Sequence, residues 1–406
     1  MLLILFPCFI FKTRVPFLFP FEHRAMASTL TVSSLLLTLN ALLLLFLLPQ
    51  CMTDAQPDLM ACKFDAIYNV GDSMSDTGNL VRENSALPFA RLPYGETFFK
   101  NATGRCSNGL LMIDYIARAA GVPFLHPYLD KDVLFLPCLG ENFAVAGSTA
   151  LSTNALAKKN ILSPVTNSSL DVQLDWMSSH FNAACLNDQD CVKKHNKALF
   201  MVGEIGGNDY NYAFFQGKPV EEVNAMVPEV VQAIKDAVKR VIGYGAVRVV
   251  VPGNFPIGCF PIYLTAFQTN NAAAYDEFHC LKWLNSFSTY HNDQLKQAIE
   301  DLRKANPNVI IVYGDYYNAF QWVYQNAPLL RFDVASVQKS CCGAGGYYNF
   351  EMTKMCGAPN VPVCTNPEER ISWDGIHLTE KAYQYMAYWL IRDILPKLNC
   401  NIVKFV

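Results

Sequence analysis

The sequence has little charge and no concentration of charge of one sign. Asp, Glu, Lys and Arg make up 17% of the 406 residues, and the formal net charge is −3. No cluster of Lys and Arg forms the basic patch that a nucleic-acid-binding protein needs. No repeat of fixed period and no low-complexity tract stands out beyond a Leu-rich N-terminus. We therefore expect no nucleic-acid partner.

A hydrophobic run long enough to span a membrane is also lacking near the N-terminus. The mostly apolar run at residues 35–48 has 14 residues, whereas a spanning helix needs about 20. A run of this length is typical of a signal-peptide core. The small residues Thr53 and Ala55 suit signal cleavage. We therefore expect residues 1–55 to be an N-terminal extension with a signal peptide, and residues 56–406 to be one domain.

A second apolar stretch precedes this signal, at residues 1–25. Translation from Met26 would give a conventional signal on its own, so Met1 is interpreted as an over-extended start. A signal anchor is the alternative. Secretion, or delivery to the vacuole by the secretory pathway, is the expected localisation, with no stable membrane span.

The 14 cysteines agree with export. Removal of Cys8 and Cys51 with the signal leaves an even number, which indicates disulfides in an exported chain. Cys185 and Cys191 flank a short polar loop and can pair locally. Four more lie in a Gly- and Pro-rich segment that we expect to be disulfide-bound: Cys341, Cys342, Cys356 and Cys364. Their spacing also permits a metal site, but an exported chain favours disulfides, so no metal is expected.

Two glycosylation sequons are present, at Asn101 and Asn167. They would carry glycans if the chain enters the secretory pathway.

Short apolar runs that end in turn residues alternate with stretches of helical periodicity. The runs predict buried strands at residues 66–70, 142–147, 198–203, 247–251 and 309–313. The periodic stretches predict helices from Asn108 to Ala120, at 221–242, 276–305 and 316–326, and from Thr379 onward. Pro228 predicts that the second of these helices begins there. Residues 88–104 and 338–370 are interpreted as long loops. The alternation predicts a parallel sheet covered by helices on both faces.

Candidate catalytic residues lie at the ends of three of the predicted strands. Ser73 and Asn208 lie in the turns after their strands, Gly147 ends its strand, and Asp374 and His377 lie just before the final helix. Because the carboxyl ends of parallel strands share one edge of a sheet, the first three should meet in space. The last two need only reach the same edge.

Together these residues have the chemistry of an ester hydrolase. Ser73 can attack a carbonyl carbon, and His377 can take its proton and return it to the leaving alkoxide. Asp374 is close enough to orient the imidazole and stabilise the imidazolium. The oxyanion would bind the backbone N–H groups of Ser73 and Gly147 and the side-chain amide of Asn208. This chemistry needs no cofactor.

Each feature alone has a commoner explanation. A Gly-Asp-Ser tripeptide is usually a strand–loop connection, and an Asn-Asp pair is usually a turn or a cap. Asp72, Asp76 and Asn79 are expected to hold the loop by hydrogen bonds to its backbone. The occurrence of all the features in this order is what indicates catalysis.

Four motifs resemble those of the GDSL esterase/lipase family, in the SGNH-hydrolase superfamily. They are GDSMSDTGN at residues 71–79, Gly147, GGND at residues 206–209 and SWDGIH at residues 372–377. Met74 stands where the family name implies Leu, which exchanges apolar side chains of similar volume. The resemblance implies a flavodoxin-like three-layer α/β/α fold with an open, shallow site. It also implies catalytic positions at Ser73, Gly147, Asn208 and His377, with Asp374 completing the triad.

Residues 201–212 and 251–259 are similar to a plant secreted subgroup that includes acetylajmalan esterase and sinapine esterase. This resemblance implies a carboxylic ester hydrolase acting on acetyl or phenolic acyl esters of small metabolites. An acyltransferase, a long-chain lipase and a non-catalytic binding protein on the same fold are alternatives. The Gly-x-Ser-x-Gly elbow of an α/β-hydrolase lipase is absent at residues 71–75 and 146–150. Six aromatic residues either line an acyl pocket or pack in the core: Phe98, Phe99, Tyr210, Tyr212, Phe214 and Phe215.

Overall fold

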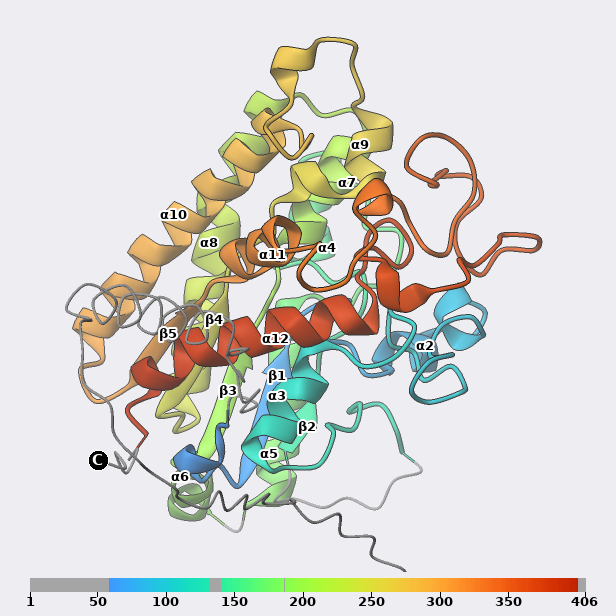
Figure 1. Cartoon of the computed structure of the whole chain (residues 1–406). Coiled ribbons are helices and arrows are strands. Elements are labelled where there is room, and N and C mark those ends of the chain that lie inside the picture. Colours follow the sequence, from blue (N-terminus) through green and yellow to red (C-terminus); the bar gives the residue numbers. More distant parts are fainter. Residues whose placement is uncertain (1–57, 132–139, 186, 401–406) are drawn as a thin grey trace, which may run out of the picture. The chain divides into compact units, whose positions relative to one another are not determined.

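The computed structural model describes residues 58–131, 140–185 and 187–400 (Figure 1). These residues all belong to one structural unit, Gln56–Val406. The predicted extension and signal peptide, residues 1–55, lie outside the described residues. Within the described part, no helix combines the length and the apolar character needed to cross a bilayer.

A five-stranded parallel sheet forms the centre of the unit. Its spatial order is β2-β1-β3-β4-β5, and each neighbouring pair is parallel. This is the order of flavodoxin-like doubly wound folds, so the predicted fold class is confirmed. The strands are β1 (Ala66–Val70), β2 (Gly140–Asn142), β3 (Ala198–Val202), β4 (Arg248–Pro252) and β5 (Ile310–Gly314).

The strand predicted at residues 142–147 is wrong in its extent, because β2 covers Gly140–Asn142. The run that follows is buried, which explains its apolar character, but it leaves the ladder. Beyond the last residue of β1, Val145 N donates to Gly71 O at 3.2 Å. The N–H of Ala144 donates instead to the side chain of Asn142 at 3.0 Å. Burial and backbone hydrogen bonds from Phe143 and Val145 to the β1 segment therefore made this run resemble a strand.

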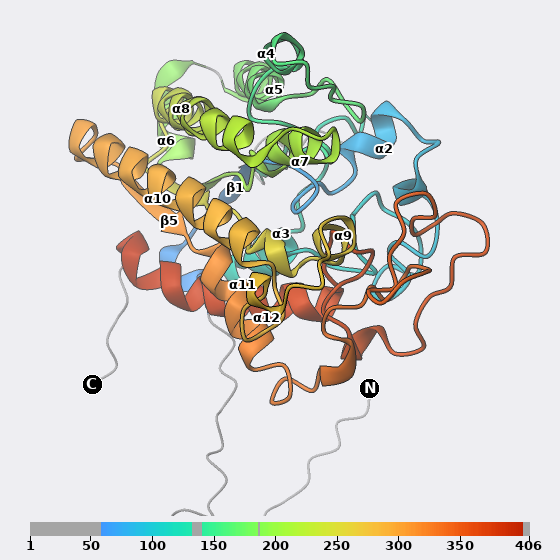
Figure 2. The ribbon, with the colours of Figure 1, turned by 90° about the horizontal axis from the view of Figure 1, so that it is seen from above.

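Helices cover both faces of the sheet, as Figures 1 and 2 show. One face carries α3 (Met112–Ala120), α11 (Tyr316–Gln325) and α12 (Glu380–Ile394), and the other carries α5 (Leu170–Ala184), α8 (Val220–Gly243) and α10 (Lys282–Ala305). Shorter helices lie in the connections: α2 (Asn79–Glu83), α4 (Thr153–Lys158), α6 (Asp188–His195), α7 (Gly207–Phe215) and α9 (Pro261–Ala266). Short 3₁₀ segments occur at Met60–Cys62, Pro88–Ala90, Ile257–Cys259, Ala272–Ala274, Val334–Ser336, Pro367–Glu369 and Leu395–Leu398.

The prediction that a helix begins at Pro228 is wrong, because α8 runs through this residue. Proline removes one intrahelical hydrogen bond and crowds the preceding turn. Val223 and Val227 lie before the proline, on the same buried face as Val230. Burial of these side chains outweighs the local cost, since tertiary packing supplies most helical stability in proteins.

Two other helices begin later than predicted. The side chain of Asn108 does not cap α3, because its Oδ1 accepts from Glu380 N at 2.7 Å. Residues 276–281 form a turn instead of the first part of α10. In this turn Asp276 Oδ1 accepts from the N–H groups of Phe278 and Cys280, each at 2.9 Å. The sequence positions of Asn108 and Asp276 suggested helix starts, but both side chains make their hydrogen bonds at other places.

Five disulfides join cysteines of the described residues. One of them links Cys185 to Cys191, as predicted. The four cysteines of the Gly- and Pro-rich segment form two nested bonds, Cys341–Cys364 and Cys342–Cys356. The remaining pairs are Cys62–Cys400 and Cys259–Cys280, while Cys106 is buried as a free thiol and Cys138 lies outside the described residues.

The nested disulfides hold the segment that carries the fourth motif. Cys341 N donates to Ser372 O at 3.0 Å, and Cys342 N donates to Trp373 O at 2.7 Å. The Trp373 side chain is fully buried among these cysteines. The position of the motif therefore depends on a cross-linked loop as well as on the sheet.

We predict that Cys342→Ser combined with Cys356→Ser lowers both stability and activity. The bond spans 14 positions, and a loop of this size contributes about 3 kcal/mol to the free energy of unfolding. Urea unfolding followed by tryptophan fluorescence checks the stability, and ester turnover checks the activity. Cys185→Ser with Cys191→Ser is the control, because it opens a loop remote from Trp373 and should leave turnover unchanged. Equal losses of turnover in both double variants would contradict this role.

Candidate active site

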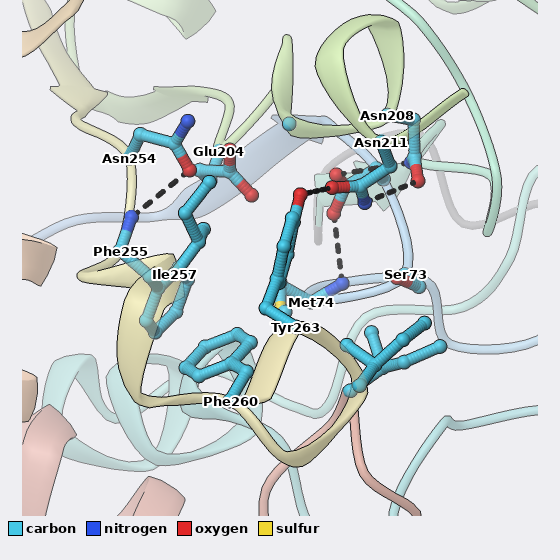
Figure 3. A pocket seen from close by; sticks show the side chains of 14 residues that line it. Ser73, Met74, Glu204, Asn208, Asn211, Asn254, Phe255, Ile257, Phe260 and Tyr263 are labelled. Atoms are coloured by element: carbon cyan, nitrogen blue, oxygen red, sulfur yellow. Dashed lines mark hydrogen bonds between the residues drawn. The ribbon is translucent and has the colours of Figure 1, made fainter. Parts of the chain in front are cut away.

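The loops that follow β1, β2 and β3 bring Ser73, Gly147 and Asn208 to one edge of the sheet. Ser73 follows β1, and Asn208 is the second residue of α7. Ser73 and Asn208 line one pocket, shown in Figure 3. Asp374 and His377 reach it from the loop before α12. The structure thus brings together residues from all four motifs.

A buried carboxylate organises the loop that carries Ser73. Asp76 accepts hydrogen bonds from four backbone N–H groups, including Gly78 and Asn79 at 2.6 Å and Ala146 at 2.8 Å. Burial raises the pKa of Asp76 above its ordinary value, and these N–H groups oppose the increase. The side-chain amide of Asn79 donates to Asn142 O, at the end of β2, and to Ala144 O, each at 2.8 Å. Asp76 thus holds the loop through its backbone, as predicted, whereas Asn79 connects the loop to β2 and the segment that follows.

Ser73, His377 and Asp374 form one continuous chain of hydrogen bonds. His377 Nε2 lies 2.8 Å from Ser73 Oγ, and His377 Nδ1 lies 2.7 Å from Asp374 Oδ2. Asp374 Oδ1 also accepts from the N–H groups of Ile376 and His377. Burial acts to raise the pKa of Asp374, but the charge and hydrogen bonds of His377 outweigh burial and lower it. Asp374 is therefore ionised beside the imidazole.

Tyr94 also binds Asp374, and the sequence did not single it out. Its hydroxyl donates to Asp374 Oδ2 at 2.8 Å, and its side chain is buried. Its ring packs edge-on against Phe89 and Trp373. Tyr94 lies in the predicted long loop at residues 88–104, but its partner is 280 positions away. No local pattern marks such a contact.

Gly147 and Asn208, the other two residues predicted to bind the oxyanion, lie on neighbouring loops. Gly147 has φ of 82°, and a Cβ there would lie 2.5 Å from Val165 Cγ1, so only glycine fits. Asn208 Nδ2 donates to Ser148 O at 2.9 Å. The backbone N–H groups of Ser73 and Gly147 donate to no acceptor among the described residues. Three donors thus lie on the loops beside the Ser73 hydroxyl.

The pocket beside Ser73 is small and is lined by both polar and apolar side chains. Its cavity volume is about 40 Å³. Figure 3 shows the Tyr263 hydroxyl donating to Asn211, with the Phe260 ring below Glu204 and Asn254. The other lining residues are Asp72, Ser73, Met74, Gly207, Asn208, Asn211, Phe255, Ile257, Ile262 and Ile376.

The six aromatic residues considered from the sequence do not line this pocket. Tyr210 and Phe214 are buried in the core. Phe98 and Phe99 pack near Arg118 and Arg105, respectively. The last two, Tyr212 and Phe215, pack partly buried against the core. Core packing or contact with arginine side chains explains five of these residues, whereas the Tyr212 hydroxyl also donates to Gly147 O at 2.8 Å.

Both glycosylation sequons place their asparagine at the surface, since Asn101 and Asn167 are exposed. Glycosylation stays a prediction. Within the described residues, one group of three potential metal ligands lies close together: Cys185, Cys191 and His195. The two sulfur atoms are joined in a disulfide, so they do not offer the thiolates that a metal needs.

Comparison with known proteins agrees with this geometry. A family model described as "GDSL-like Lipase/Acylhydrolase" matches residues 67–390. Acetylajmalan esterase 1 of Rauvolfia serpentina is 43% identical over 343 residues, which cover 84% of this chain and 89% of that protein. A GDSL esterase/lipase of Arabidopsis thaliana is 45% identical over 341 residues, which cover 84% of this chain and 92% of that protein. Acetylajmalan esterase 2 of Rauvolfia serpentina is 42% identical over 354 residues, which cover 86% of this chain and 96% of that protein. The resemblance that the motifs predicted is confirmed.

We predict that Tyr94→Phe lowers kcat for p-nitrophenyl acetate. The variant removes one donor from a buried carboxylate, and a hydrogen bond to a charged group contributes about 1.5–3 kcal/mol. Part of that loss should appear as roughly a 10-fold lower kcat, because Asp374 holds the imidazole less firmly. Tyr115→Phe is the matched control, since its hydroxyl contacts Glu380 at 3.4 Å, away from the triad. A kcat of Tyr94→Phe equal to that of the control would refute the role of Tyr94.

Proposed function

Because the chain belongs to the GDSL-like lipase/acylhydrolase family, we propose that it is a secreted serine esterase that hydrolyses small-metabolite esters through an acyl-enzyme on Ser73. Membership makes the chain a carboxylic ester hydrolase, as the sequence predicted. The observation that carries the proposed mechanism is the unbroken hydrogen-bond chain from Ser73 through His377 to Asp374.

Acylation begins with attack of Ser73 Oγ on the ester carbonyl carbon. His377 Nε2 takes the hydroxyl proton as the bond forms. The resulting oxyanion is stabilised by the N–H groups of Ser73 and Gly147 and by the Asn208 amide. Asp374 stays ionised and stabilises the imidazolium. When the intermediate collapses, His377 gives the proton to the leaving alkoxide, and the acyl group stays on Ser73.

Deacylation repeats these steps with water. His377 takes a proton from a water molecule, which attacks the acyl carbonyl carbon. The second tetrahedral intermediate uses the same oxyanion donors. Its collapse breaks the bond to Ser73 Oγ, and His377 returns the proton to that oxygen. The products are the alcohol and the carboxylic acid, and the enzyme is restored.

The size of the cavity favours a short acyl group. A volume of about 40 Å³ holds roughly three water molecules, which is comparable with an acetyl group. Relatives that are named acetylajmalan esterases agree with this size. A phenolic acyl group or a long alkyl chain would need the side chains of Phe260 and Tyr263 to move. We therefore favour acetyl esters over phenolic acyl esters and over a long-chain lipase activity.

Export is supported by the cysteine chemistry of the described residues. Five disulfides form readily in an oxidising compartment and are rare in the cytosol. The exposed sequon residues Asn101 and Asn167 are accessible to glycosylation. We propose secretion, or delivery to the vacuole by the same pathway, with a small-molecule ester as the partner.

We predict that Ser73→Ala abolishes hydrolysis of p-nitrophenyl acetate, with a loss of at least about 10³-fold in kcat. The fold should be retained, because the hydroxyl makes no structural bond besides that to His377 among the described residues. Circular dichroism and the thermal midpoint check this. The matched control is Ser179→Ala, at an exposed position of α5. Unchanged turnover in purified Ser73→Ala would overturn the nucleophile assignment.

We also predict that kcat/KM falls steeply as the acyl chain lengthens. A panel of p-nitrophenyl acetate, butyrate and palmitate, with feruloyl and sinapoyl esters, measures this dependence. Acetate should be the best substrate, and Phe260→Ala should raise relative activity toward butyrate because it enlarges the cavity. A preference of the wild type for palmitate would contradict the proposal. Addition of an acceptor alcohol tests the acyltransferase alternative, since transfer would give a new ester instead of acetate.

A further inference from the structure

Two buried carboxyl groups beside Ser73 have no part in the mechanism above. Asp72 directly precedes Ser73, and Glu204 lies two residues beyond β3. Both side chains are about 3% exposed and line the same pocket as Ser73. The backbones are joined, since Asp72 N donates to Glu204 O at 3.2 Å, and the two carboxyl groups share a hydrogen bond. Two adjacent buried carboxylates cannot both be ionised at low cost, so the pair holds a proton.

The hydrogen-bond donors around the pair show which group is ionised. Asp72 Oδ1 accepts from Met74 N at 2.9 Å, and Asp72 Oδ2 lies 3.3 Å from Asn208 Nδ2. Glu204 Oε1 has no hydrogen-bond partner among the described residues, and the only backbone donor to this carboxyl group there is the Gly207 N–H. Donors stabilise the charged form of a carboxyl group, and Asp72 has more of them. Glu204 is therefore the neutral acid, and its hydroxyl donates a hydrogen bond to Asp72.

The electrostatics of the pair agree with this assignment. Burial, followed by the charge of Asp72, raises the pKa of Glu204 well above its usual range. Burial also raises the pKa of Asp72, to about 6, while the Met74 N–H and the charge of His377 oppose the increase. At neutral pH the pair thus carries one negative charge, centred on Asp72.

That charge lies next to the amide of Asn208. The amide has two N–H donors, of which one binds Ser148 O at 2.9 Å. The other faces Asp72 Oδ2 across 3.3 Å, which is long for a charge-assisted hydrogen bond. A carboxylate that already accepts a hydrogen bond from Glu204 attracts this N–H less strongly. Asp72 therefore holds the second N–H only weakly, and this N–H can turn to an oxyanion.

We propose that Glu204 is a positioning residue of ester hydrolysis: as a neutral acid hydrogen-bonded to Asp72, it limits the pair to one negative charge and keeps the Asn208 amide available to the oxyanion. This inference rests on the proposed function, because it takes Ser73 as the nucleophile and Asn208 as an oxyanion donor. Glu204 acts in the transition state, where the negative charge develops, so its effect belongs to kcat and not to KM.

Two substitutions of nearly equal length separate this role from simple packing. Glu204→Gln keeps a neutral N–H donor toward Asp72, whereas Glu204→Met fills the same space with no donor. We expect Glu204→Gln to keep kcat for p-nitrophenyl acetate within about 3-fold of wild type. Glu204→Met should lower kcat by about 10- to 100-fold, below the loss of roughly 10²- to 10³-fold for a whole oxyanion donor. KM should change less than about 3-fold in both variants.

A double-mutant cycle with Asn208→Ala tests whether Glu204 acts through the amide. In the Asn208→Ala background, Glu204→Met should lower kcat by less than about 3-fold more. The inference is overturned if Glu204→Met keeps the wild-type kcat or if Glu204→Gln is as slow as Glu204→Met. The same loss from Glu204→Met with and without Asn208 also overturns it. If Glu204→Met does not fold, as judged by circular dichroism, the kcat of Glu204→Gln alone decides, and a fall of about 10-fold or more overturns the inference.

Failure of this inference is distinguishable from failure of the proposed function. If Ser73→Ala or Asn208→Ala keeps the wild-type kcat, the proposed mechanism itself fails. If both lose activity while the Glu204 outcomes above are not met, the esterase mechanism stands and only the role of Glu204 is removed.

Discussion

The hydrogen bond between His377 Nε2 and Ser73 Oγ joins residues that are 304 positions apart, and the function depends on its length. Neither residue lies in a helix or a strand. Four backbone N–H groups on Asp76 hold the first loop. The loop that carries His377 is held by backbone hydrogen bonds from two disulfide-bonded cysteines, Cys341 and Cys342. The sheet brings the loops to one edge, and these local restraints set the distance at which a proton can be transferred.

The same edge gathers several buried carboxyl groups, although the proposed reaction would create negative charge there. Each group is accommodated differently. Asp76 is surrounded by N–H donors, Asp374 faces the imidazole of His377, and Asp209 accepts from the N–H groups of Ala150 and Leu151. For Asp72 the partner is a second acid, Glu204. Charge that would otherwise repel the oxyanion is thus kept on atoms that already accept hydrogen bonds.

The sequence predicted the parallel sheet and brought Ser73, Asn208 and His377 to one site, because strand ends and turn residues are local patterns. It did not predict Tyr94 or Glu204, whose contacts with Asp374 and Asp72 span long separations and leave no periodic signal. The errors at β2, α3, α8 and α10 have a common origin. Each prediction placed an element boundary from a local pattern, such as an apolar run, a proline or a capping side chain. Tertiary contacts determine instead where these elements begin and end.

Most apolar residues that line the cavity beside Ser73 belong to a different part of the chain from the catalytic groups. Phe255 and Ile257 follow β4, and Phe260 and Tyr263 lie at the start of α9. The segment is cross-linked by Cys259–Cys280 and touches the catalytic loop through Ile262 N, which donates to Gly375 O at 3.1 Å. A substitution in these walls can therefore change which acyl group fits while the Ser73–His377–Asp374 chain keeps its geometry. For this reason the four motifs identify the reaction, and the segment after β4 is where we expect the choice of ester to be set.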